Sequence, residues 1–264
     1  MSASDVVPAA GTVTIAPDEA EAGRRAGEVA AQVLREALRE RGQARVVFAS
    51  APSQDAMIRT LTSSPDIDWT KVTSLHLDEY RGIDPQHRAA FGQWLADRLP
   101  EQAQAGLDRI RTDGTSQEEI ERYTQVLQDG PIDLVCLGIG VNGHLAFNEP
   151  GDTSFEDPAA VREVALTHAS RKQQVDEGLF PSLDDVPTHA LSMTVPAIMR
   201  GAALVCTVLG EAKADAVGAA LTGELTEQVP ATALRTHERM YLFLDEGAAA
   251  NLPADFPADR GEVR

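Results

Sequence analysis

Short apolar segments alternate with amphipathic segments along most of the chain. Five runs are almost continuously apolar and rich in β-branched residues, which is typical of strands buried on both faces of a sheet. They cover residues 44–49, 72–77, 132–137, 203–208 and 240–244, and weaker strand patterns cover 161–166 and 190–195. Helical patterns lie between them, at 17–41, 55–61, 91–98, 116–127 and 211–221.

The segment 17–41 is the clearest helix. Its apolar side chains recur at the helical spacing of three and four residues, its first turn is acidic, and Gly42 follows two arginines at its end. Strands that alternate with helices in this way predict an α/β fold, a mostly parallel sheet with helices on both faces.

The chain shows no internal repeat, no low-complexity tract and no break in composition. We therefore expect a single domain over residues 1–264. A polar stretch at 170–187 is expected to form a mobile flap. The polar, proline-interrupted tail at 251–264 is expected to be frayed.

Charge narrows the class of partner. The 264 residues are 43% apolar, enough for a substantial core, and 41 acidic against 23 basic residues give a net charge of −18. Such a surface repels nucleic acid and anionic lipid headgroups. If the ligand is a small anion, its site must be a local exception in an acidic protein.

The cysteines and the N-terminal residues indicate a compartment. Cys136 and Cys206 each lie in an apolar run without metal-binding or redox spacing, which favours buried, reduced thiols over a disulfide or metal pair. Residues 1–16 lack the basic and apolar regions of a signal peptide, and no window resembles a membrane span. We expect a cytoplasmic protein.

Candidate chemistry gathers where strands end, because ligands of open α/β sheets bind beyond the carboxyl ends of the strands. Asp78 and Glu79 follow the strand at 72–77. A half-desolvated carboxylate there has the raised basicity that abstraction of a carbon-bound proton needs. The alternative is that Asp78 caps a turn and Glu79 is solvated.

A glycine-rich segment follows the strand at 132–137. Gly138, Gly140 and Gly143 form a G-x-G-x-x-G pattern, but Pro150 and Gly151 end any helix too early for a dinucleotide fingerprint. The glycines instead suit backbone amides that approach a ligand. His144 and Glu149 are about one helical turn apart and can converge for proton transfer, unless His144 is only structural.

Two further strand ends are candidates for an anion site. Lys213 stands in a first helical turn, where a cation is unfavourable unless an anion is near, although Glu211 and Asp215 could also neutralise it. The turn from Ser50 through Ala51 to Ser53 could offer hydroxyls and amides to a phosphate. Ser53 could equally be an ordinary helix N-cap.

Four segments resemble the glucosamine-6-phosphate deaminase/isomerase family in order and spacing: LDEYRGIDPQH, IDLVCLGIGVNGHLAFNEPG, LGEAKADAV and PATALRTHE. The resemblance runs from about Arg45 to Glu246, and AFNEPG is its most specific part. It implies a modified Rossmann-like fold and a cofactor-free, metal-free conversion of an amino-aldose phosphate to a ketose phosphate and ammonia. The sister 6-phosphogluconolactonases differ after the histidine, so Glu149 separates the two activities.

The resemblance also implies residue roles. Asp78 corresponds to the base that removes the C2 proton, His144 to the histidine that assists ring opening, and Glu149 to its acidic partner. Lys213 corresponds to a phosphate ligand. The phosphate site is then expected to combine Lys213 with Ser50, Ala51 and Ser53, with the amides of Gly140 and Gly143, and with Arg171 on the flap.

The chain departs from the family pattern around this site. Asn142 stands where many members have Asp, so protonated His144 should be less stabilised. The usual Gly-rich phosphate loop is absent at 50–53, and Pro52 has no amide donor. Ala90 replaces a common serine, and Asp176 aligns with a position often held by a substrate-binding arginine.

Other functions remain open on the sequence. One is a phosphosugar lactonase, or an isomerase of a different amino sugar. Another is a sugar-phosphate-binding protein without turnover, which Asn142 and the missing glycines would suit. Nucleotide binding through the glycine pattern is a minor alternative. Family members are often homo-oligomers, but no interface signature stands out.

Overall fold

A six-stranded parallel sheet forms the centre of the molecule, as seen in a computed structural model that describes residues 11–176 and 178–260. The strand order is β1-β9-β8-β5-β2-β3, and all neighbouring strands run parallel. The strands are β1 (Val13–Ala16), β2 (Ala44–Phe48), β3 (Val72–His76), β5 (Leu134–Leu137), β8 (Leu204–Val208) and β9 (Met240–Asp245). The predicted α/β class is confirmed.

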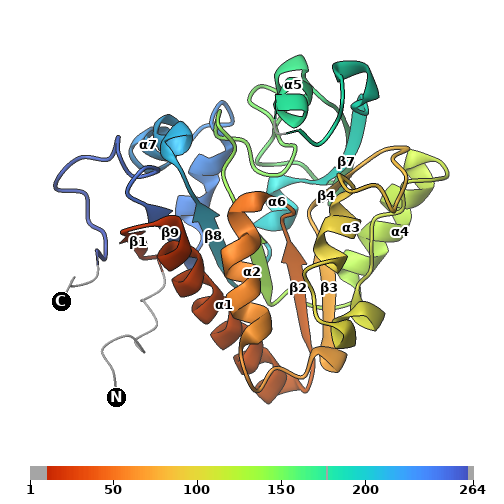
Figure 1. Cartoon of the computed structure of the whole chain (residues 1–264), viewed down its shortest axis with the longest axis horizontal. Helices are drawn as coiled ribbons and strands as arrows, with labels where there is room; N and C mark the ends of the chain where they lie inside the picture. The colour runs from red at the N-terminus through yellow and green to blue at the C-terminus, as the bar shows by residue number, and fades with distance from the viewer. Residues whose placement is uncertain (1–10, 177, 261–264) are drawn as a thin grey trace.

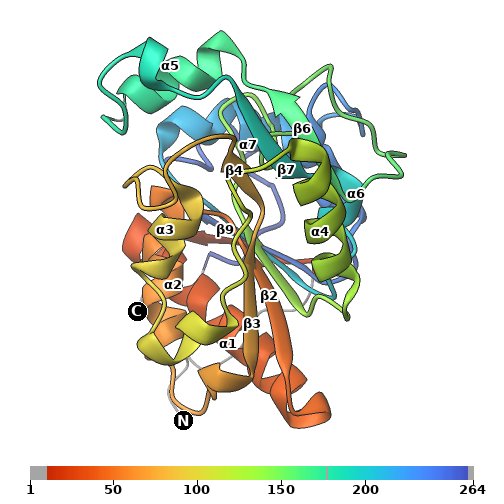
Figure 2. The same ribbon diagram turned by 90° about the vertical axis from the view of Figure 1, so that its right-hand side faces the viewer.

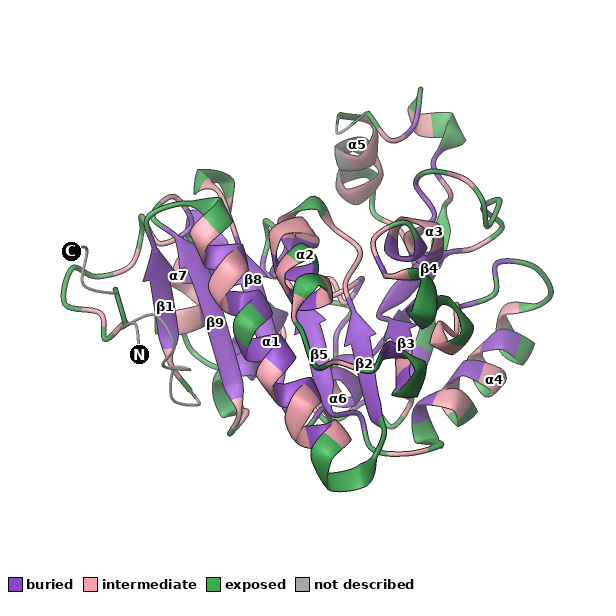
Figure 3. Ribbon diagram, turned by 60° about the horizontal axis from the view of Figure 1, so that its bottom comes forward, coloured by how far each residue is buried: buried purple, intermediate pink, exposed green. Residues whose placement is uncertain are grey.

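Helices cover both faces of this sheet (Figures 1 and 3). One apolar core lies under α1 (Glu19–Arg41), α2 (Asp55–Ser63) and α3 (Phe91–Ala96). The other lies under α4 (Ser116–Gln128), α6 (Val195–Ile198) and α7 (Ala214–Thr222). Successive strand residues point to opposite faces, so Val46 and Phe48 join the first core and Val47 the second. This explains the continuous apolar runs.

Helix α1 has the ends that its sequence predicts. The Asp18 side chain caps its start by accepting a hydrogen bond from the Glu21 N–H at 2.8 Å. Gly42 ends it in the left-handed conformation (φ 72°), and its N–H donates to Leu38 O. Within the helix, Gly23 and Gly27 let α2 approach closely, because an added Cβ would lie 2.3 Å from the Ala56 Cβ and 2.5 Å from the Thr60 Cβ, respectively.

A second, antiparallel sheet lies beyond the end of β3 (Figure 2). It has the order β4-β7-β6, from β4 (Asp78–Tyr80), β7 (His189–Met193) and β6 (Val161–Ala165). The strand expected over 72–77 therefore ends at His76. Leu77 passes the chain between the sheets: its N–H donates to Phe48 O at 3.0 Å, and its C=O accepts from the Met193 N–H at 2.8 Å.

Other elements differ in detail from the sequence predictions. The helix expected over 211–221 divides into the 3-10 helix η5 (Glu211–Lys213) and α7, and the flap contains α5 (His168–Asp176) and a 3-10 helix, η4 (Leu183–Asp185). The remaining 3-10 helices are η1 (Pro52–Gln54), η2 (Trp69–Lys71), η3 (Glu101–Gly106) and η6 (Pro230–Thr236). Strand β1 was not expected, because four apolar residues carry little signal without their partner β9.

The C-terminal tail is tied to the sheet edge. The Asp259 N–H donates to Val13 O at 2.8 Å, and its C=O accepts from the Ile15 N–H at 2.8 Å. Residues 261–264 lie outside the described part of the chain. Within that part, no helix combines the length and apolar character needed to cross a bilayer.

Two glycines in helix interiors should respond oppositely to alanine. Gly27→Ala places a methyl group 2.6 Å from Met57 O and should destabilise the protein by about 1–3 kcal/mol through overpacking. Gly218→Ala in α7 meets nothing closer than 3.6 Å and should stabilise it by about 0.5–1 kcal/mol through helix propensity. Urea unfolding of both variants checks this, and the same sign for both would contradict the close packing of α1 on α2.

Candidate active site

The loops after three neighbouring strands meet at one edge of the parallel sheet. The chain moves outward from β2 to β3 and, in the opposite direction, from β5 to β8, so the crevice of an open α/β sheet falls between β2 and β5. Here Gln54 Nε2 donates to Thr207 O at 3.3 Å, and Gly138 lies against both groups. The ends of β2, β5 and β8, three of the strand ends chosen from the sequence, therefore adjoin one another.

Asp78 and Glu79 are both buried, which excludes a solvated Glu79. Asp78 is 8% exposed and Glu79 2%. The Glu79 carboxylate accepts backbone N–H groups from Tyr80 at 3.0 Å, Phe91 at 3.0 Å and Gly92 at 2.8 Å. Among the described residues, none donates a hydrogen bond to the Asp78 carboxylate. The Glu79 side chain is thus held by three backbone donors, and Asp78 is a buried carboxyl group whose oxygens accept no hydrogen bond from the described residues.

The two carboxyl groups have raised pKa values. Burial, and next the neighbouring Glu79, raise the pKa of Asp78 to about 8. Burial also raises the pKa of Glu79, although its three N–H donors oppose this. Those donors favour the ionised form of Glu79, so the proton resides preferentially on Asp78. The ionised form of Asp78, which this pKa makes predominant only above about pH 8, is basic enough to take a proton from carbon.

His144, Asn142 and Glu149 form a second hydrogen-bonded group. Asn142 Oδ1 lies 2.9 Å from His144 Nδ1, and Asn142 Nδ2 donates to Glu149 Oε2 at 2.7 Å. Glu149 Oε1 also lies 3.4 Å from His144 Nδ1. Since both oxygens near Nδ1 are acceptors, Nδ1 carries a proton. Nε2 is left to exchange a proton with a ligand, since no described residue bonds to it.

Asn142 does what a carboxylate could not do here. Its amide accepts from the histidine and donates to the glutamate, whereas an aspartate would repel Glu149. Burial tends to raise the pKa of Glu149, but hydrogen bonds from His144, Asn142 and Ser170 outweigh it and lower the pKa to about 2. Glu149 is therefore an anion at neutral pH, as an acidic partner of His144 must be.

Ser192 on β7 connects the two groups. It is paired with Asp78 across the antiparallel ladder, and its hydroxyl accepts the Phe147 N–H at 3.1 Å. Next to it, Met193 O accepts from Asn148 Nδ2 at 2.8 Å. The 144–149 loop is therefore fastened to the strand opposite Asp78, which brings Asp78 and the histidine loop to the same region.

Two glycines are required by this loop. A Cβ on Gly140 would lie 2.2 Å from the His144 ring, and one on Gly143 would lie 2.7 Å from Val229 Cγ1. Gly143 also has φ 87°, which favours glycine. The pattern therefore accommodates the histidine ring and a tight turn rather than the N-terminus of a dinucleotide-binding helix.

Apart from the glycines and the flap arginine, the residues expected to bind phosphate lie on two separate segments, one after β2 and one after β8. Lys213 ends η5 beyond β8, whose neighbour β5 leads to the glycine loop. The Ser50 hydroxyl donates to Phe91 O at 3.0 Å, and Ala51 precedes η1. Ser53 does not cap α2, as one alternative required: it lies inside η1, and its hydroxyl accepts from Gln54 Nε2 at 3.2 Å.

Arg171 differs from its expected role. Its guanidinium donates to Leu183 O at 2.5 Å and Val186 O at 3.0 Å, so in this structure it ties α5 to the rest of the flap. Its neighbour Ser170 instead faces the site and donates to Glu149 Oε1 at 2.7 Å.

Neither a metal-binding group nor a surface groove marks the site among the described residues. The described residues contain no group of three or more His, Cys, Asp or Glu side chains that could hold a metal ion. Two open grooves of about 480 and 500 Å³ lie along α1 and α2 and beside Arg98, and none of the predicted site residues lines them. The hydrogen-bonded groups at the strand ends are the better guide to the chemistry.

Comparison with known proteins decides the family. Residues 17–242 match the model of glucosamine-6-phosphate isomerases/6-phosphogluconolactonase. The chain belongs to this family. Its sequence is 33% identical over 229 residues to glucosamine-6-phosphate deaminase of Streptococcus equi subsp. zooepidemicus, covering 86% of this chain and 94% of that protein. Identity to the Streptococcus pneumoniae glucosamine-6-phosphate deaminase is 32%, over 86% of this chain and 95% of that protein.

Solved structures of the family share the fold. A monomeric glucosamine-6-phosphate deaminase superposes with a TM-score of 0.82 at 27% identity, covering 91% of this chain and 99% of that one. The 6-phosphogluconolactonase from Trypanosoma brucei gives 0.75 at 15% identity, over 92% and 98% of the two chains. At that identity the likeness shows the fold alone.

Sequence reasoning missed several residues of the site. Ser170, Ser192 and Asn148 belong to the site through hydrogen bonds to distant segments, which no local sequence pattern predicts. Glu79 had a signal, because a second carboxylate directly after a buried strand must find donors or solvent. The three amides that bind it come from β4 and the start of α3, which only the fold brings together.

Removal of the Asp78 charge should stabilise the fold. The folded pKa of about 8 lies above the ordinary 3.8, so this group costs stability as pH rises between these values. Asp78→Asn should therefore raise the free energy of unfolding by about 1–3 kcal/mol near pH 8 and by less near pH 5. Thermal unfolding of both proteins at the two pH values checks this, and an equal effect at both would contradict the raised pKa.

Proposed function

We propose that the protein converts glucosamine 6-phosphate, or a close amino-sugar phosphate, and water to fructose 6-phosphate and ammonia. The observation that carries the proposal is the hydrogen-bonded group of His144, Asn142 and Glu149. It lies in the same region as a buried Asp78 that accepts no hydrogen bond from the described residues. Membership of the family and the identity to bacterial glucosamine-6-phosphate deaminases support this choice of substrate.

Ring opening is the first step. The pyranose opens when the O1 proton is removed and O5 is protonated, and a single imidazole can do both if it faces the two oxygens. His144 presents Nε2 for this, because Nδ1 is held by Asn142 and Glu149. The Glu149 anion stabilises the imidazolium that forms when Nε2 takes a proton.

Isomerisation is the second step. Asp78 removes the proton from C2 of the open aldehyde; the electrons of the C2–H bond form the C1–C2 double bond of an enolamine, and O1 takes a proton from water. Return of the proton to C1 leaves an iminium at C2. Burial of the Asp78 side chain and the neighbouring Glu79 make the ionised Asp78 carboxylate basic enough to remove the C2 proton. Water then adds to C2, ammonia leaves, and the ketose phosphate remains.

The phosphate site draws on fewer groups than the sequence predicts, because the Ser50 hydroxyl already donates to Phe91 O, the Gly140 N–H to His144 O and the Gly143 N–H to Gly140 O. We place the phosphate beside Lys213, with the Ser53 hydroxyl, which accepts from Gln54, as a further donor. A local site of this kind resolves the conflict between a small anionic ligand and a net charge of −18. We further propose one domain over the whole chain, acting in the cytoplasm, where the two buried thiols would stay reduced.

Incubation with glucosamine 6-phosphate tests the reaction directly. We expect equal amounts of ammonium and fructose 6-phosphate from the wild type. Asp78→Asn should lower kcat by about 10²–10⁴-fold, because the base is lost while binding groups remain. Glu121→Gln on the exposed side of α4 is a matched control and should keep wild-type rates. Unchanged turnover in Asp78→Asn would overturn the base assignment.

The same assay separates the other candidates. Hydrolysis of 6-phosphogluconolactone without ammonium release would identify a lactonase. Saturable thermal stabilisation by glucosamine 6-phosphate without product would identify a binding protein without turnover.

Lys213→Gln tests the phosphate site. Loss of one charge-assisted hydrogen bond of about 1.5–3 kcal/mol should raise KM for glucosamine 6-phosphate about 10- to 100-fold. Activity on unphosphorylated glucosamine should not change. Equal losses on both substrates would show that Lys213 does not bind the phosphate.

A further inference from the structure

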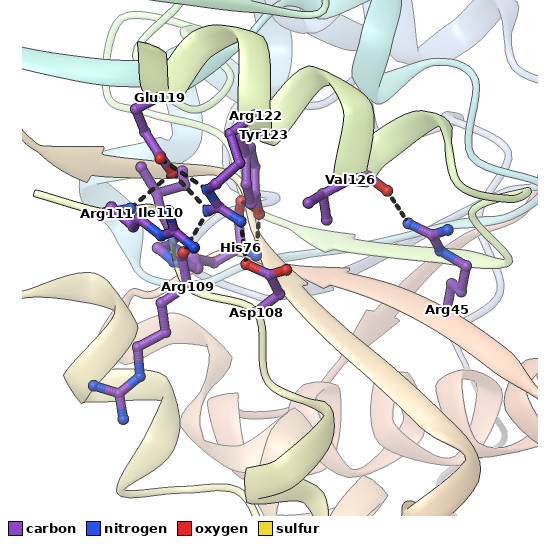
Figure 4. Close-up of polar contacts among 10 residues, drawn as sticks. All are labelled: Arg45, His76, Asp108, Arg109, Ile110, Arg111, Glu119, Arg122, Tyr123 and Val126. Atoms are coloured by element: carbon purple, nitrogen blue, oxygen red, sulfur yellow. Dashed lines mark hydrogen bonds and ion pairs between the residues drawn. The ribbon is translucent and has the colours of Figure 1, made fainter. Parts of the chain in front are cut away.

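His76, the last residue of β3, is a buried histidine that the proposed reaction does not use. Its side chain has no exposed surface, and it lies two residues before Asp78. The ring is enclosed by the end of β3, residues 108–111 and helix α4 (Figure 4). A histidine in such a place must have partners for both ring nitrogens.

The partners of His76 fix its tautomer. Its Nε2 lies 2.9 Å from the backbone N of Ile110, which can only donate, so Nε2 accepts. Its Nδ1 lies 2.8 Å from the backbone O of Asp78, which can only accept, so Nδ1 carries the proton and donates. The ring is therefore neutral, and its Nδ1–H holds the carbonyl of the residue proposed as the base.

The backbone of His76 is held as well. The Tyr123 hydroxyl accepts the His76 N–H at 3.0 Å and donates to the His76 C=O at 2.7 Å. Tyr123 is itself fully buried on α4. The backbone of His76 is thus bound by the Tyr123 hydroxyl, and the His76 ring is bound by the backbone groups of Asp78 and Ile110.

An ion-pair cluster holds the segment that supplies the Ile110 amide. The Arg122 guanidinium donates to Asp108 Oδ1 at 2.8 Å, to Arg109 O at 2.8 Å and to the buried Glu119 at 2.6 Å. Glu119 in turn accepts the Arg111 N–H at 2.8 Å. Helix α4 therefore fixes residues 108–111, which fix the His76 ring (Figure 4).

Burial is the main reason that His76 is neutral. Burial, and to a smaller extent the charge of Arg109, outweigh the Asp78 carbonyl and the carboxylates of Asp108 and Glu119 and lower the pKa of His76 to about 4. Arg122 neutralises both of these carboxylates. On the β4 side, the described contact with the ring is the backbone carbonyl of Asp78.

We infer that His76 is a positioning residue for Asp78. Its Nδ1–H fixes the peptide group after Asp78, and this peptide group sets the directions in which the side chains of Asp78 and Glu79 leave β4. The inference rests on the proposed function, in which Asp78 moves the C2 proton. It predicts that loss of the Nδ1–H bond misaligns the base without weakening sugar or phosphate binding.

Two amide substitutions separate the two ring bonds. In His76→Asn the side-chain NH₂ can take the place of Nδ1–H and keep the bond to Asp78 O, but it does not reach Ile110. In His76→Gln the longer amide reaches the place of Nε2 and can accept from Ile110, but the bond to Asp78 O is lost. Each variant loses one buried hydrogen bond, so each controls for the stability loss of the other.

The expected result is a difference in kcat alone. His76→Gln should lower kcat about 10- to 100-fold, as expected for a misplaced catalytic group, while His76→Asn stays within about threefold of the wild type. KM for glucosamine 6-phosphate should not change in either, and the two Tm values should fall together. Equal kcat values in the two folded variants, or a loss confined to KM, would overturn the inference.

A measurement on the wild-type protein tests the inference even if the two variants fail to fold. Nitrogen NMR of ¹⁵N-histidine-labelled protein should show His76 as the Nδ1–H tautomer from about pH 5 to about pH 9, where a free histidine titrates near pH 6.5. A protonated ring or an Nε2–H tautomer would overturn the inference.

The outcomes distinguish the inference from the function on which it rests. If the wild type releases no ammonium from glucosamine 6-phosphate, the proposed function is wrong and the role of His76 in it falls too. If the wild type turns over and the Asn and Gln variants do not differ, only the positioning role is wrong.

Discussion

The passage of one chain segment between two sheets is the constraint on which the site depends. Leu77 donates its N–H to the parallel sheet and accepts at its C=O from the antiparallel one, so the residues after it cannot shift along either ladder. Asp78 comes directly after this residue and is buried because two sheets meet there. The same junction aligns Ser192, and through it the loop that carries His144 and Glu149. A side-chain position at a junction is fixed by two independent sets of backbone hydrogen bonds.

Burial and hydrogen-bond donors, rather than ion pairs with Lys or Arg, set the pKa values of the carboxyl groups in the site. Three amides donate to Glu79 and oppose the rise of its pKa on burial, and Glu149 is an anion because His144, Asn142 and Ser170 donate to it. Asp78 has no such donors among the described residues and is the carboxyl group whose proton can move. Two adjacent carboxyl groups thereby acquire different chemistry from their surroundings, although the chain as a whole carries a large negative charge.

The sequence predicted the elements whose signal is local. The apolar runs gave the central strands because each is buried on both faces, and Asp18 and Gly42 predicted the ends of α1. Strand ends pointed to Asp78, His144, Glu149 and Lys213, since the carboxyl edge of a parallel sheet gathers them. The structure brings Asp78, His144 and Glu149 to one region, whereas their roles in catalysis remain predictions.

What the sequence did not predict depends on contacts between distant segments. Arg171 and Ser170 are neighbours on α5, and only the orientation of the helix decides that the serine bonds to Glu149 while the arginine bonds to the flap. The tautomer of His76 is set by the Ile110 amide, thirty-four residues away. A one-dimensional pattern holds no information on such pairs, because burial and donor geometry arise only when the layers assemble.

The two free cysteines lie one on each face of the central sheet. Cys136 and Cys206 lie on the neighbouring central strands β5 and β8, but Cys136 faces the core under α1 and α2, and Cys206 faces the core under α7. Burial raises the pKa of both thiols, so neither is reactive while its helical layer is closed. The rate at which each thiol is alkylated therefore measures the opening of one face of the sheet, and the pair reports whether the two layers of the protein separate together or one at a time.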